Sequence, residues 1–220
     1  MSKLSLIAID GPSGVGKSTT AKRVAQQLGW GYLDTGAMYR ATALALQRAG
    51  VVLEDRPRLE RVLAGLKIQQ RGIREYLDGE DVTEAIRTPE ITRMVTPVSA
   101  DARVREVLVD QQRRIGGAGG WVVDGRDIGT VVFPTACCKL YLTASVTARA
   151  GRRFQELRDK GVPQPMVDVA ADIQRRDLAD STRAVSPLCK AADAVELDSS
   201  AMTLDQVVDW IAAHHGAHAS

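Results

Sequence analysis

The sequence has few cysteines, and their spacing excludes both a disulfide framework and a metal site with cysteine ligands. Only 3 of the 220 residues are cysteine. Cys137 and Cys138 are adjacent and Cys189 lies far along the chain, so they form neither a paired disulfide framework nor a metal-ligand spacing. We therefore expect all three to be reduced residues of the core.

The chain also lacks an excess of charge of either sign. Its 29 Lys and Arg residues face 27 Asp and Glu residues, which leaves a formal net charge of +2. A charge this small gives no general field that would attract a polyanion. We expect no nucleic acid among its partners.

Long hydrophobic runs are absent as well. The beginning, MSKLSLIAIDG, reaches a glycine after a short apolar run, and no uninterrupted apolar stretch is long enough to span a bilayer. We expect a cytoplasmic protein that does not interact with a membrane. A length of 220 residues suits a single domain over 1–220 that carries a small inserted lobe.

Short apolar runs alternate with segments of helical spacing. The runs are rich in branched residues and predict buried parallel strands: LSLIAID at 4–10, WVVDG from Trp121, KLYLT from Lys139 and AVELD from Ala194. The segments with helical spacing are 17–28, 37–49, 91–115, 146–159, 167–179 and 204–214. This alternation predicts an α/β fold with a three-layer core around a parallel sheet.

One stretch breaks the alternation. Between Leu66 and Thr83 lie short strand-like pieces separated by turn signals at Gly72 and at Asp78-Gly79. We expect a small antiparallel insertion here, which occupies approximately residues 63–90.

The strongest signal is GPSGVGKS at residues 11–18, which follows a predicted strand, opens a predicted helix and fits the G-x-x-x-x-G-K-[ST] pattern. Glycines let the backbone N–H groups turn toward a polyphosphate, and the helix adds the positive end of its dipole. Lys17 would neutralise the β- and γ-phosphate oxygens, and Ser18 would bind Mg²⁺. The pattern predicts ATP binding by Gly11, Pro12, Ser13, Gly14, Val15, Gly16, Lys17, Ser18 and Thr19. The alternative is a glycine-rich turn without a ligand.

A phosphate loop alone does not separate a kinase from a GTPase switch or an ATP-driven motor. No N-K-x-D signature of a GTPase follows it, whereas motifs that contain arginine recur along the chain. These arginines are Arg40, Arg105, Arg126, Arg176 and Arg183. Their distribution suits an anionic acceptor.

Five further motifs resemble those of bacterial cytidylate kinases. They are YLDTGAMYR at 32–40, GEDVTEAIRTPEI at 79–91, RVRE at 103–106, DGRDIGTVVFP at 124–134 and RRDLADSTRAVSPL at 175–188. The likeness covers nearly the whole chain, and the order and spacing of the motifs are more specific than the phosphate loop alone. It implies that the antiparallel insertion belongs to the region that binds the nucleoside monophosphate.

The resemblance implies a role for individual residues. It assigns the acceptor phosphate to Arg40, Arg126 and Arg183, with Thr35 and Tyr39 shaping the pocket. It assigns cytosine to Thr96, Arg105 and Asp127, and the sugar to Arg176 and Asp180. It further implies a short helical lid at approximately 148–163, in which Arg152, Arg153 and Arg158 lie over ATP.

These residues suit transfer of a phosphoryl group between two anions. A phosphate monoester loses its second proton with a pKa of about 6, so the acceptor needs no general base. The need is for fixed positive charge, which Lys17, Arg126 and Arg183 would supply as catalytic residues. Asp124 ends a predicted strand, where it could orient Mg²⁺ or stabilise a turn.

Base selection follows from hydrogen-bond chemistry. The carboxylate of Asp127 can accept a hydrogen bond from cytosine N4, whereas uracil would present an oxygen there, and Arg105 can donate to the base acceptors. The expected reaction is ATP + CMP → ADP + CDP, with dCMP as a second acceptor, in a monomer. Two alternatives stay open: a small-molecule kinase similar to shikimate or gluconate kinases, and a non-enzymatic nucleotide-binding regulator.

Overall fold

The computed structural model describes residues 4–162 and 164–218, and the chain divides into two compact units. The larger unit comprises residues 1–32 and 116–220, and the smaller unit comprises residues 33–115. The boundary at Gly116 coincides with the start of the glycine-rich segment 116–120, which connects a helix to the strand that begins at Trp121.

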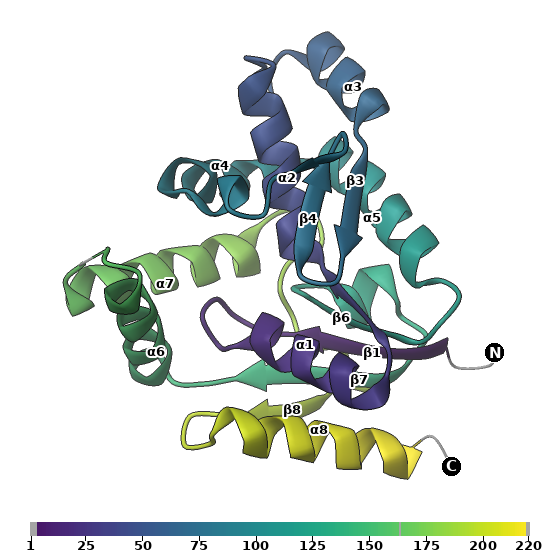
Figure 1. Ribbon diagram of the computed structural model, residues 1–220, viewed down its shortest axis with the longest axis vertical. Helices are drawn as coiled ribbons and strands as arrows, with labels where there is room; N and C mark the ends of the chain where they lie inside the picture. Colours follow the sequence, from purple (N-terminus) through teal and green to yellow (C-terminus); the bar gives the residue numbers. More distant parts are fainter. Residues whose placement is uncertain (1–3, 163, 219–220) are drawn as a thin grey trace. The chain divides into compact units, whose positions relative to one another are not determined.

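A five-stranded parallel sheet forms the centre of the larger unit (Figure 1), in the order β2-β6-β1-β7-β8. The strands are β1 Leu4–Asp10, β2 Gly31–Asp34, β6 Trp121–Gly125, β7 Ala136–Thr143 and β8 Val195–Asp198. Strand β1 is central and pairs in parallel with β6 and with β7. The predicted α/β fold with a parallel sheet is therefore confirmed.

The larger unit also contains helices. They are α1 Lys17–Leu28, α6 Val146–Asp159, α7 Met166–Thr182 and α8 Leu204–His218, together with one π-helical turn, η2 Ile128–Val132. All four helices overlap segments with predicted helical spacing. The π-helical turn was not predicted, and it directly follows the DGRD motif at 124–127.

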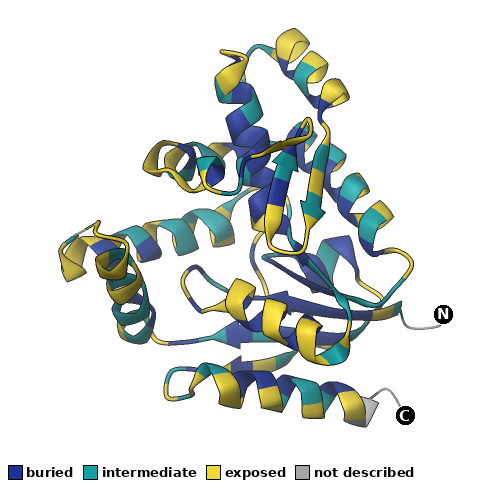
Figure 2. Ribbon diagram, in the orientation of Figure 1, coloured by how far each residue is buried: buried dark blue, intermediate teal, exposed yellow. Residues whose placement is uncertain are grey.

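The main core of the larger unit lies between the sheet, α1 and α8. Ile9 of β1, Leu140 of β7 and Val24 of α1 are fully or almost fully buried, as is Ile211 of α8. Figure 2 shows that each of these two helices buries one side and exposes the other. Apolar residues recur on α1 at helical spacing, which explains why one side of the helix packs on the sheet.

The smaller unit contains the predicted antiparallel insertion. Its sheet has the order β3-β4-β5, with β3 Ile68–Arg71, β4 Arg74–Leu77 and β5 Glu80–Asp81. Gly72, with φ of 61°, lies in the turn that joins β3 to β4. The helical elements are α2 Thr35–Arg48, α3 Arg56–Gly65, the 3-10 turn η1 Ala85–Arg87, α4 Pro89–Ala100 and α5 Ala102–Gly116.

The prediction of one helix over 91–115 is wrong, because the segment forms two helices that meet at Asp101. The backbone of Asp101 is extended, with φ of −69° and ψ of 124°. Its Oδ1 accepts hydrogen bonds from the N–H groups of Arg103 (3.0 Å) and Val104 (3.1 Å). Asp101 thus caps the start of α5, since a carboxylate here satisfies amides that lack partners within the helix.

The cysteines differ in burial. Cys138 is buried in the core and Cys137 is half-buried, whereas Cys189 is exposed. The prediction that all three are core residues is wrong for Cys189. This residue follows Leu188 in an irregular segment between α7 and β8, where neither helical nor strand periodicity places its side chain.

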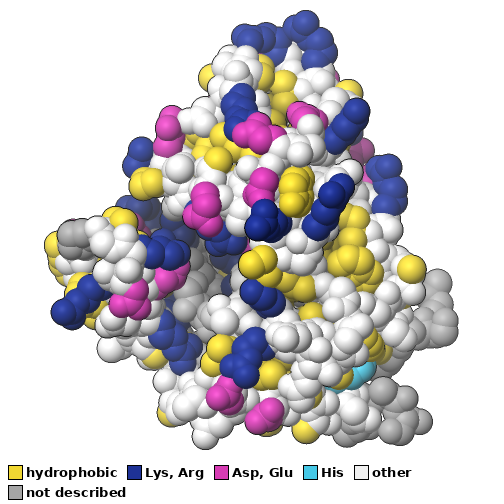
Figure 3. Space-filling model, in the orientation of Figure 1, with side chains coloured by type: hydrophobic (Ala, Val, Ile, Leu, Met, Phe, Trp, Pro, Cys, Tyr) yellow, Lys and Arg dark blue, Asp and Glu magenta, His cyan; other side chains and the backbone are white. Residues whose placement is uncertain are grey.

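The surface carries charges of both signs. Figure 3 shows Lys and Arg side chains interspersed with Asp and Glu on the visible face. Several of them form exposed ion pairs, such as Arg48 with Glu80 (2.8 Å) and Arg74 with Asp81 (3.0 Å). Across the two described stretches, no helix has both the length and the apolar character needed to cross a membrane.

Replacing Asp101 with alanine should lower the free energy of unfolding by about 1–2 kcal/mol at neutral pH, because α5 loses its cap. Burial opposes ionisation, but hydrogen bonds from Arg56 and from the first amides of α5 hold the pKa of Asp101 below 3.8. The stability that the ionised Asp101 carboxylate contributes is therefore present above pH 3.8 and is lost as the pH falls below that value. Urea unfolding measures it, with Asp110→Ala on the exposed side of α5 as the control. Equal losses in both variants would contradict the capping role.

Candidate active site

The loop after β1 has the geometry that its glycines permit. At Gly11 φ is 148°, and a Cβ atom there would lie 2.1 Å from the carbonyl oxygen of Leu142. Gly16 precedes α1 with φ of 97°, a conformation that other residues rarely adopt. Glycine is therefore required at both positions, at the first for space and at the second for conformation.

Lys17 extends back over this loop. It is 6% exposed, and its Nζ donates to the carbonyl oxygens of Gly11 and Pro12, both at 2.7 Å. Burial lowers the pKa of Lys17 to about 7, and repulsion from Arg126 acts in the same direction. Nearby carboxylates, Asp124 foremost, oppose this shift. An anion bound beside Nζ would favour the charged ammonium.

Oxygen ligands converge at the start of α1. The Oγ of Ser18 donates to Oδ2 of Asp124 (2.8 Å), and the hydroxyl of Tyr32 donates to Oδ1 of the same carboxylate (3.0 Å). Mg²⁺ prefers oxygen ligands and is commonly held by one or two protein groups together with phosphates and water. Ser18 and Asp124 fit that donor set. No group of three or more His, Cys, Asp or Glu side chains suited to a metal occurs among the described residues.

Cations gather beside Lys17. Nε of Arg126 donates to Oδ2 of Asp180 (2.6 Å). Although burial disfavours its charged form, the carboxylate of Asp180 raises the pKa of Arg126. The pKa of Arg176 is lowered by burial and then by repulsion from Arg153, and Arg126 adds to this repulsion. These arginines are close enough to repel one another, and a bound polyanion would relieve this repulsion.

Asp127 and Arg183 form a buried ion pair. Nη2 of Arg183 lies 3.3 Å from Oδ1 of Asp127, and the two side chains are 5% and 6% exposed. The Nε of Arg183 also donates to the carbonyl oxygen of Ser186 (2.7 Å). The structure therefore brings together two residues with different predicted roles, because the resemblance assigns Arg183 to the acceptor phosphate and Asp127 to cytosine.

Asp10, at the end of β1, holds the segment that follows β6. Its Oδ1 accepts from the N–H of Ile128 and its Oδ2 from the N–H of Gly129, both at 2.8 Å. The side chain therefore anchors the start of the π-helical turn, directly after Asp127. Burial raises the pKa of Asp10 to about 6, against the effect of these two hydrogen bonds.

The smaller unit contains the other predicted acceptor residues. Nη1 of Arg40 donates to Oγ1 of Thr92 (2.8 Å) and to the carbonyl oxygen of Ile86 (3.3 Å). The guanidinium of Arg105 lies over the ring of Tyr39, 5.5 Å from its centroid. Arg105 is almost fully buried although it carries a charge. Its Nη1 donates to the carbonyl oxygen of Ser99 (3.2 Å).

Thr35 and Thr96 complete the predicted set in this unit. Thr35 is buried at the first position of α2. Thr96 lies half-buried in α4, directly before Pro97, and its carbonyl oxygen accepts from the hydroxyl of Ser99 (3.0 Å). The structure shows no contact that distinguishes Thr96 from an ordinary helix residue.

The three predicted lid arginines all lie on α6 but differ in their contacts. Arg152 donates to the carbonyl oxygen of Val15 in the phosphate loop (3.3 Å) and to the Oγ of Ser199 (3.2 Å). Arg153 forms an ion pair with Glu156 (2.8 Å). Arg158 lines a cavity of about 390 Å³.

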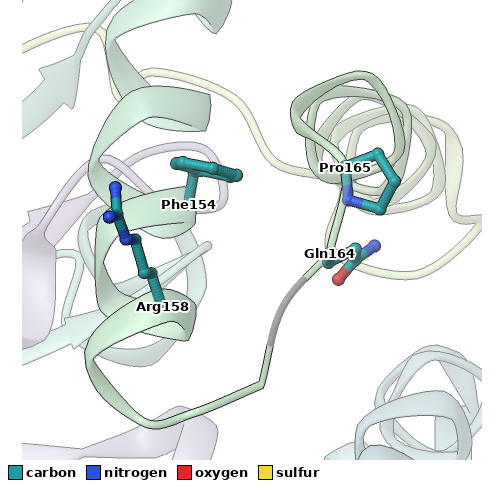
Figure 4. Close-up of a pocket in the computed structure, with 4 residues that line it drawn as sticks. All are labelled: Phe154, Arg158, Gln164 and Pro165. Carbon is teal, nitrogen blue, oxygen red and sulfur yellow. The ribbon is translucent and has the colours of Figure 1, made fainter.

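Figure 4 shows the lining of this cavity. The ring of Phe154 points from α6 toward Pro165, and Gln164 lies beside Pro165 across the opening. Apolar groups dominate the lining, and Arg158 is its one charged side chain among the described residues.

Sequence reasoning missed four residues near the phosphate loop: Asp10, Tyr32, Arg149 and Asp177. Asp10 and Asp177 had a local signal. Asp10 ends an apolar strand, where the fold places ligand groups, and Asp177 lies inside the RRDLADSTR motif. Tyr32 also had a local signal, since it opens the YLDTGAMYR motif, although its contact with Asp124 is made 92 positions away. Arg149 had none, because its contact with Ser13 is made across 136 positions.

Comparisons with known protein sequences point to one family. The sequence profile of the family described as cytidylate kinase matches residues 7–216. A cytidylate kinase of Enterococcus faecalis is 50% identical over 212 residues, which cover 94% of this chain and 93% of that protein. A bifunctional pantoate ligase/cytidylate kinase of Synechococcus elongatus is 46% identical over 215 residues, which cover 94% of this chain and 41% of that protein.

Among solved structures, a gluconokinase from Sinorhizobium meliloti has a TM-score of 0.52 at 14% identity. The match covers 99% of this chain and 94% of that one. At this identity the likeness concerns the fold alone.

Replacing Asp10 with asparagine should remove one pH-dependent component of stability. The folded protein holds the Asp10 proton up to a pKa of about 6, and the unfolded chain releases it near 3.8, so native stability falls as the pH rises between these values. The variant cannot titrate there. As the pH rises from about 4 to about 7, the free energy of unfolding of Asp10→Asn should increase by about 3 kcal/mol relative to that of the native protein. Asp209→Asn, on the exposed surface of α8, is the control, and a constant difference would refute the assignment.

Proposed function

Because the chain belongs to the cytidylate kinase family, we propose that it transfers the γ-phosphate of ATP to CMP, giving ADP and CDP, with dCMP as a second acceptor. The reaction is a step of pyrimidine nucleotide metabolism. The observation that carries the proposal is the cluster of cations at the phosphate loop: the buried Lys17, whose Nζ donates to the carbonyl oxygens of Gly11 and Pro12, and Arg126, which is close enough to repel it. Such a cluster is stable when it faces the phosphates of two nucleotides.

The donor binds at the phosphate loop. Residues 11–19 supply backbone N–H groups, the start of α1 supplies its dipole, and Lys17 supplies a charge for the β- and γ-phosphates. Ser18 and Asp124 would hold Mg²⁺, which when bound neutralises charge on the phosphates and fixes their orientation. The hydrogen bond from Tyr32 keeps the Asp124 carboxylate directed toward Ser18.

The acceptor phosphate is held by arginines. Arg126 and Arg183 are catalytic residues in this proposal, and Arg40 is also assigned to this phosphate, with Thr35 and Tyr39 shaping its pocket. Asp180 orients Arg126 through its Nε, and the Nη1 of Arg126 donates to the carbonyl oxygen of Gly125 (3.4 Å), so that Nη2 can bind a phosphate oxygen. The CMP phosphate is already an oxyanion near neutral pH, so transfer depends on alignment and charge stabilisation without proton removal.

Base and sugar recognition use the remaining residues. Asp127 accepts from cytosine N4, and Arg105 and Thr96 contact the other polar atoms of the base. Arg176 and Asp180 contact the sugar. The lid spans approximately 148–163, of which residue 163 lies outside the described residues, and Arg152, Arg153 and Arg158 face ATP from it.

Neither alternative function is favoured. The gluconokinase resembles this chain in fold alone, at 14% identity, and a hydroxyl acceptor would leave the Asp127 and Arg105 pair without a role. A non-enzymatic regulator would not need the arginines that accompany the phosphate loop. We further propose that the enzyme acts as a cytoplasmic monomer that binds neither nucleic acid nor a membrane. Its net charge of +2 gives no general field that would attract a polyanion.

The test is consumption of ATP with a panel of acceptors, with Mg²⁺ present and after its removal with EDTA. CMP and dCMP should be phosphorylated, whereas AMP, GMP, UMP and shikimate should react far more weakly. Lys17→Ala should stay folded and lose most activity, because it removes charge at the transferring phosphate. A preparation that phosphorylates shikimate and leaves CMP unchanged would overturn the proposal.

Asp127→Asn tests base selection. The amide can turn its NH₂ group toward uracil O4, so kcat/KM should fall for CMP while the ratio of CMP to UMP narrows from about 10⁴ or more. The KM for CMP should also rise, because Arg183 loses its charged partner. ATP affinity should change little.

The matched control is Asp205→Asn, on an exposed carboxylate of α8 that pairs with Arg23. Steady-state kinetics with both acceptors, together with circular dichroism, compare the two variants. If folded Asp127→Asn keeps the native ratio of CMP to UMP, Asp127 does not select the base.

A further inference from the structure

Two consecutive peptide groups of the phosphate loop are held by side chains from outside the loop. The N–H of Ser13 donates to Oδ1 of Asp177 on α7, at 2.8 Å. The carbonyl oxygen of Ser13 accepts from Nη1 of Arg149 on α6, at 2.9 Å. Arg149 and Asp177 also form an ion pair with each other.

The first of these peptide groups also contacts Lys17. The carbonyl oxygen of Pro12 accepts from Nζ of Lys17, and the N–H of Ser13 belongs to the same peptide unit. Because a peptide unit is planar, fixing its N–H direction also fixes its C=O direction. Asp177 therefore sets the orientation of a carbonyl group that positions the Lys17 ammonium.

The contacts are buried and rigidly supported. The side chain of Arg149 is 6% exposed, and its Nε donates to the carbonyl oxygen of Ala144 (3.0 Å). A Cβ atom on Gly14 would lie 3.4 Å from Cδ1 of Ile173, so the loop packs directly on α7. Ile173 itself belongs to a small apolar cluster that joins α6 to α7.

We propose that Arg149 and Asp177 are positioning residues that transmit the placement of α6 and α7 to the phosphate loop and to Lys17. This inference rests on the proposed function, since the loop is taken to bind the ATP phosphates. Neither side chain touches the reacting atoms. Their effect is to keep the Pro12–Ser13 peptide group and the Ser13 carbonyl in the directions that the loop requires.

A consequence is that the position of the predicted lid arginines is coupled to the geometry of the phosphate loop. Arg152, Arg153 and Arg158 lie on the same helix as Arg149, within 3 to 9 positions of it. A shift of α6 that moves these arginines also moves the hydrogen bond from Arg149 to Ser13. The predicted lid and the phosphate loop therefore change position together, because one helix contacts both.

Three variants test the proposal. Asp177→Asn keeps the size of the side chain and one acceptor for Ser13 but removes the charge that faces Arg149. Asp177→Ala removes both contacts, and Arg149→Met removes the guanidinium while keeping much of the apolar stem. Arg175→Met is the matched control, because it removes an exposed ion pair with Asp172 from the same helix.

Two binding measurements separate a positioning role from a merely structural one. Calorimetric titration with a non-hydrolysable ATP analogue should show affinity reduced by roughly tenfold in Asp177→Ala and Arg149→Met, and by less in Asp177→Asn. Titration with CMP alone should show a smaller change in affinity than titration with the ATP analogue in Asp177→Ala and Arg149→Met. Hydrogen exchange of the Ser13 amide should be accelerated in Asp177→Ala, and Arg175→Met should match the native protein in every measurement.

The outcomes are distinct. Equal loss of ATP-analogue and CMP affinity, or native ATP-analogue affinity in folded Asp177→Ala, would overturn the positioning role. If Asp177→Ala or Arg149→Met does not fold, Asp177→Asn decides, and native analogue affinity in it would overturn the proposal. Failure of the native protein to phosphorylate CMP would instead refute the proposed function, independently of these comparisons.

Discussion

Positive charge crowded into the larger unit is the constraint on which its other features depend. Burial and repulsion lower the pKa of Lys17 to about 7, and the same two effects lower the pKa of Arg176. Such an arrangement is unfavourable by itself, and two other arginines of the unit are paired with carboxylates: Asp180 bonds Arg126 and Asp127 pairs with Arg183. These carboxylates reduce the cost of burial without cancelling the charge. In the proposed function, the phosphates of the nucleotides would supply the remaining negative charge.

The parallel sheet explains how residues far apart in the sequence reach this cluster. Strands β1 and β6 are neighbours with Asp10 opposite Gly125, so the phosphate loop and the DGRD segment leave the sheet at the same edge. Asp10 then fixes the second loop through the N–H groups of Ile128 and Gly129. Strand β1 therefore fixes the positions of both loops. In this way a sheet can hold reacting groups in a defined geometry.

Local patterns predicted the fold well because they act over a few residues. The phosphate loop, the strands from Leu4 and Trp121 and the antiparallel insertion were all recognisable in this way. The break at Asp101 was missed because apolar spacing continues across it, although an aspartate before a new helical turn is a capping signal. Arg149 and Asp177 could not be assigned, since each meets Ser13 only after folding, across 136 and 164 positions.

The ion pair between Asp127 and Arg183 bears on how an acceptor would be selected. In the proposed site one partner reads the base and the other binds the phosphate, yet the two are buried against each other. If the base presents a hydrogen-bond acceptor to Asp127, the carboxylate receives no hydrogen bond from the base and would interact more strongly with Arg183. The guanidinium would then be drawn away from the phosphate oxygens. Discrimination against uracil would thus act on alignment of the transferring group as well as on binding, because one buried contact joins the two ends of the acceptor.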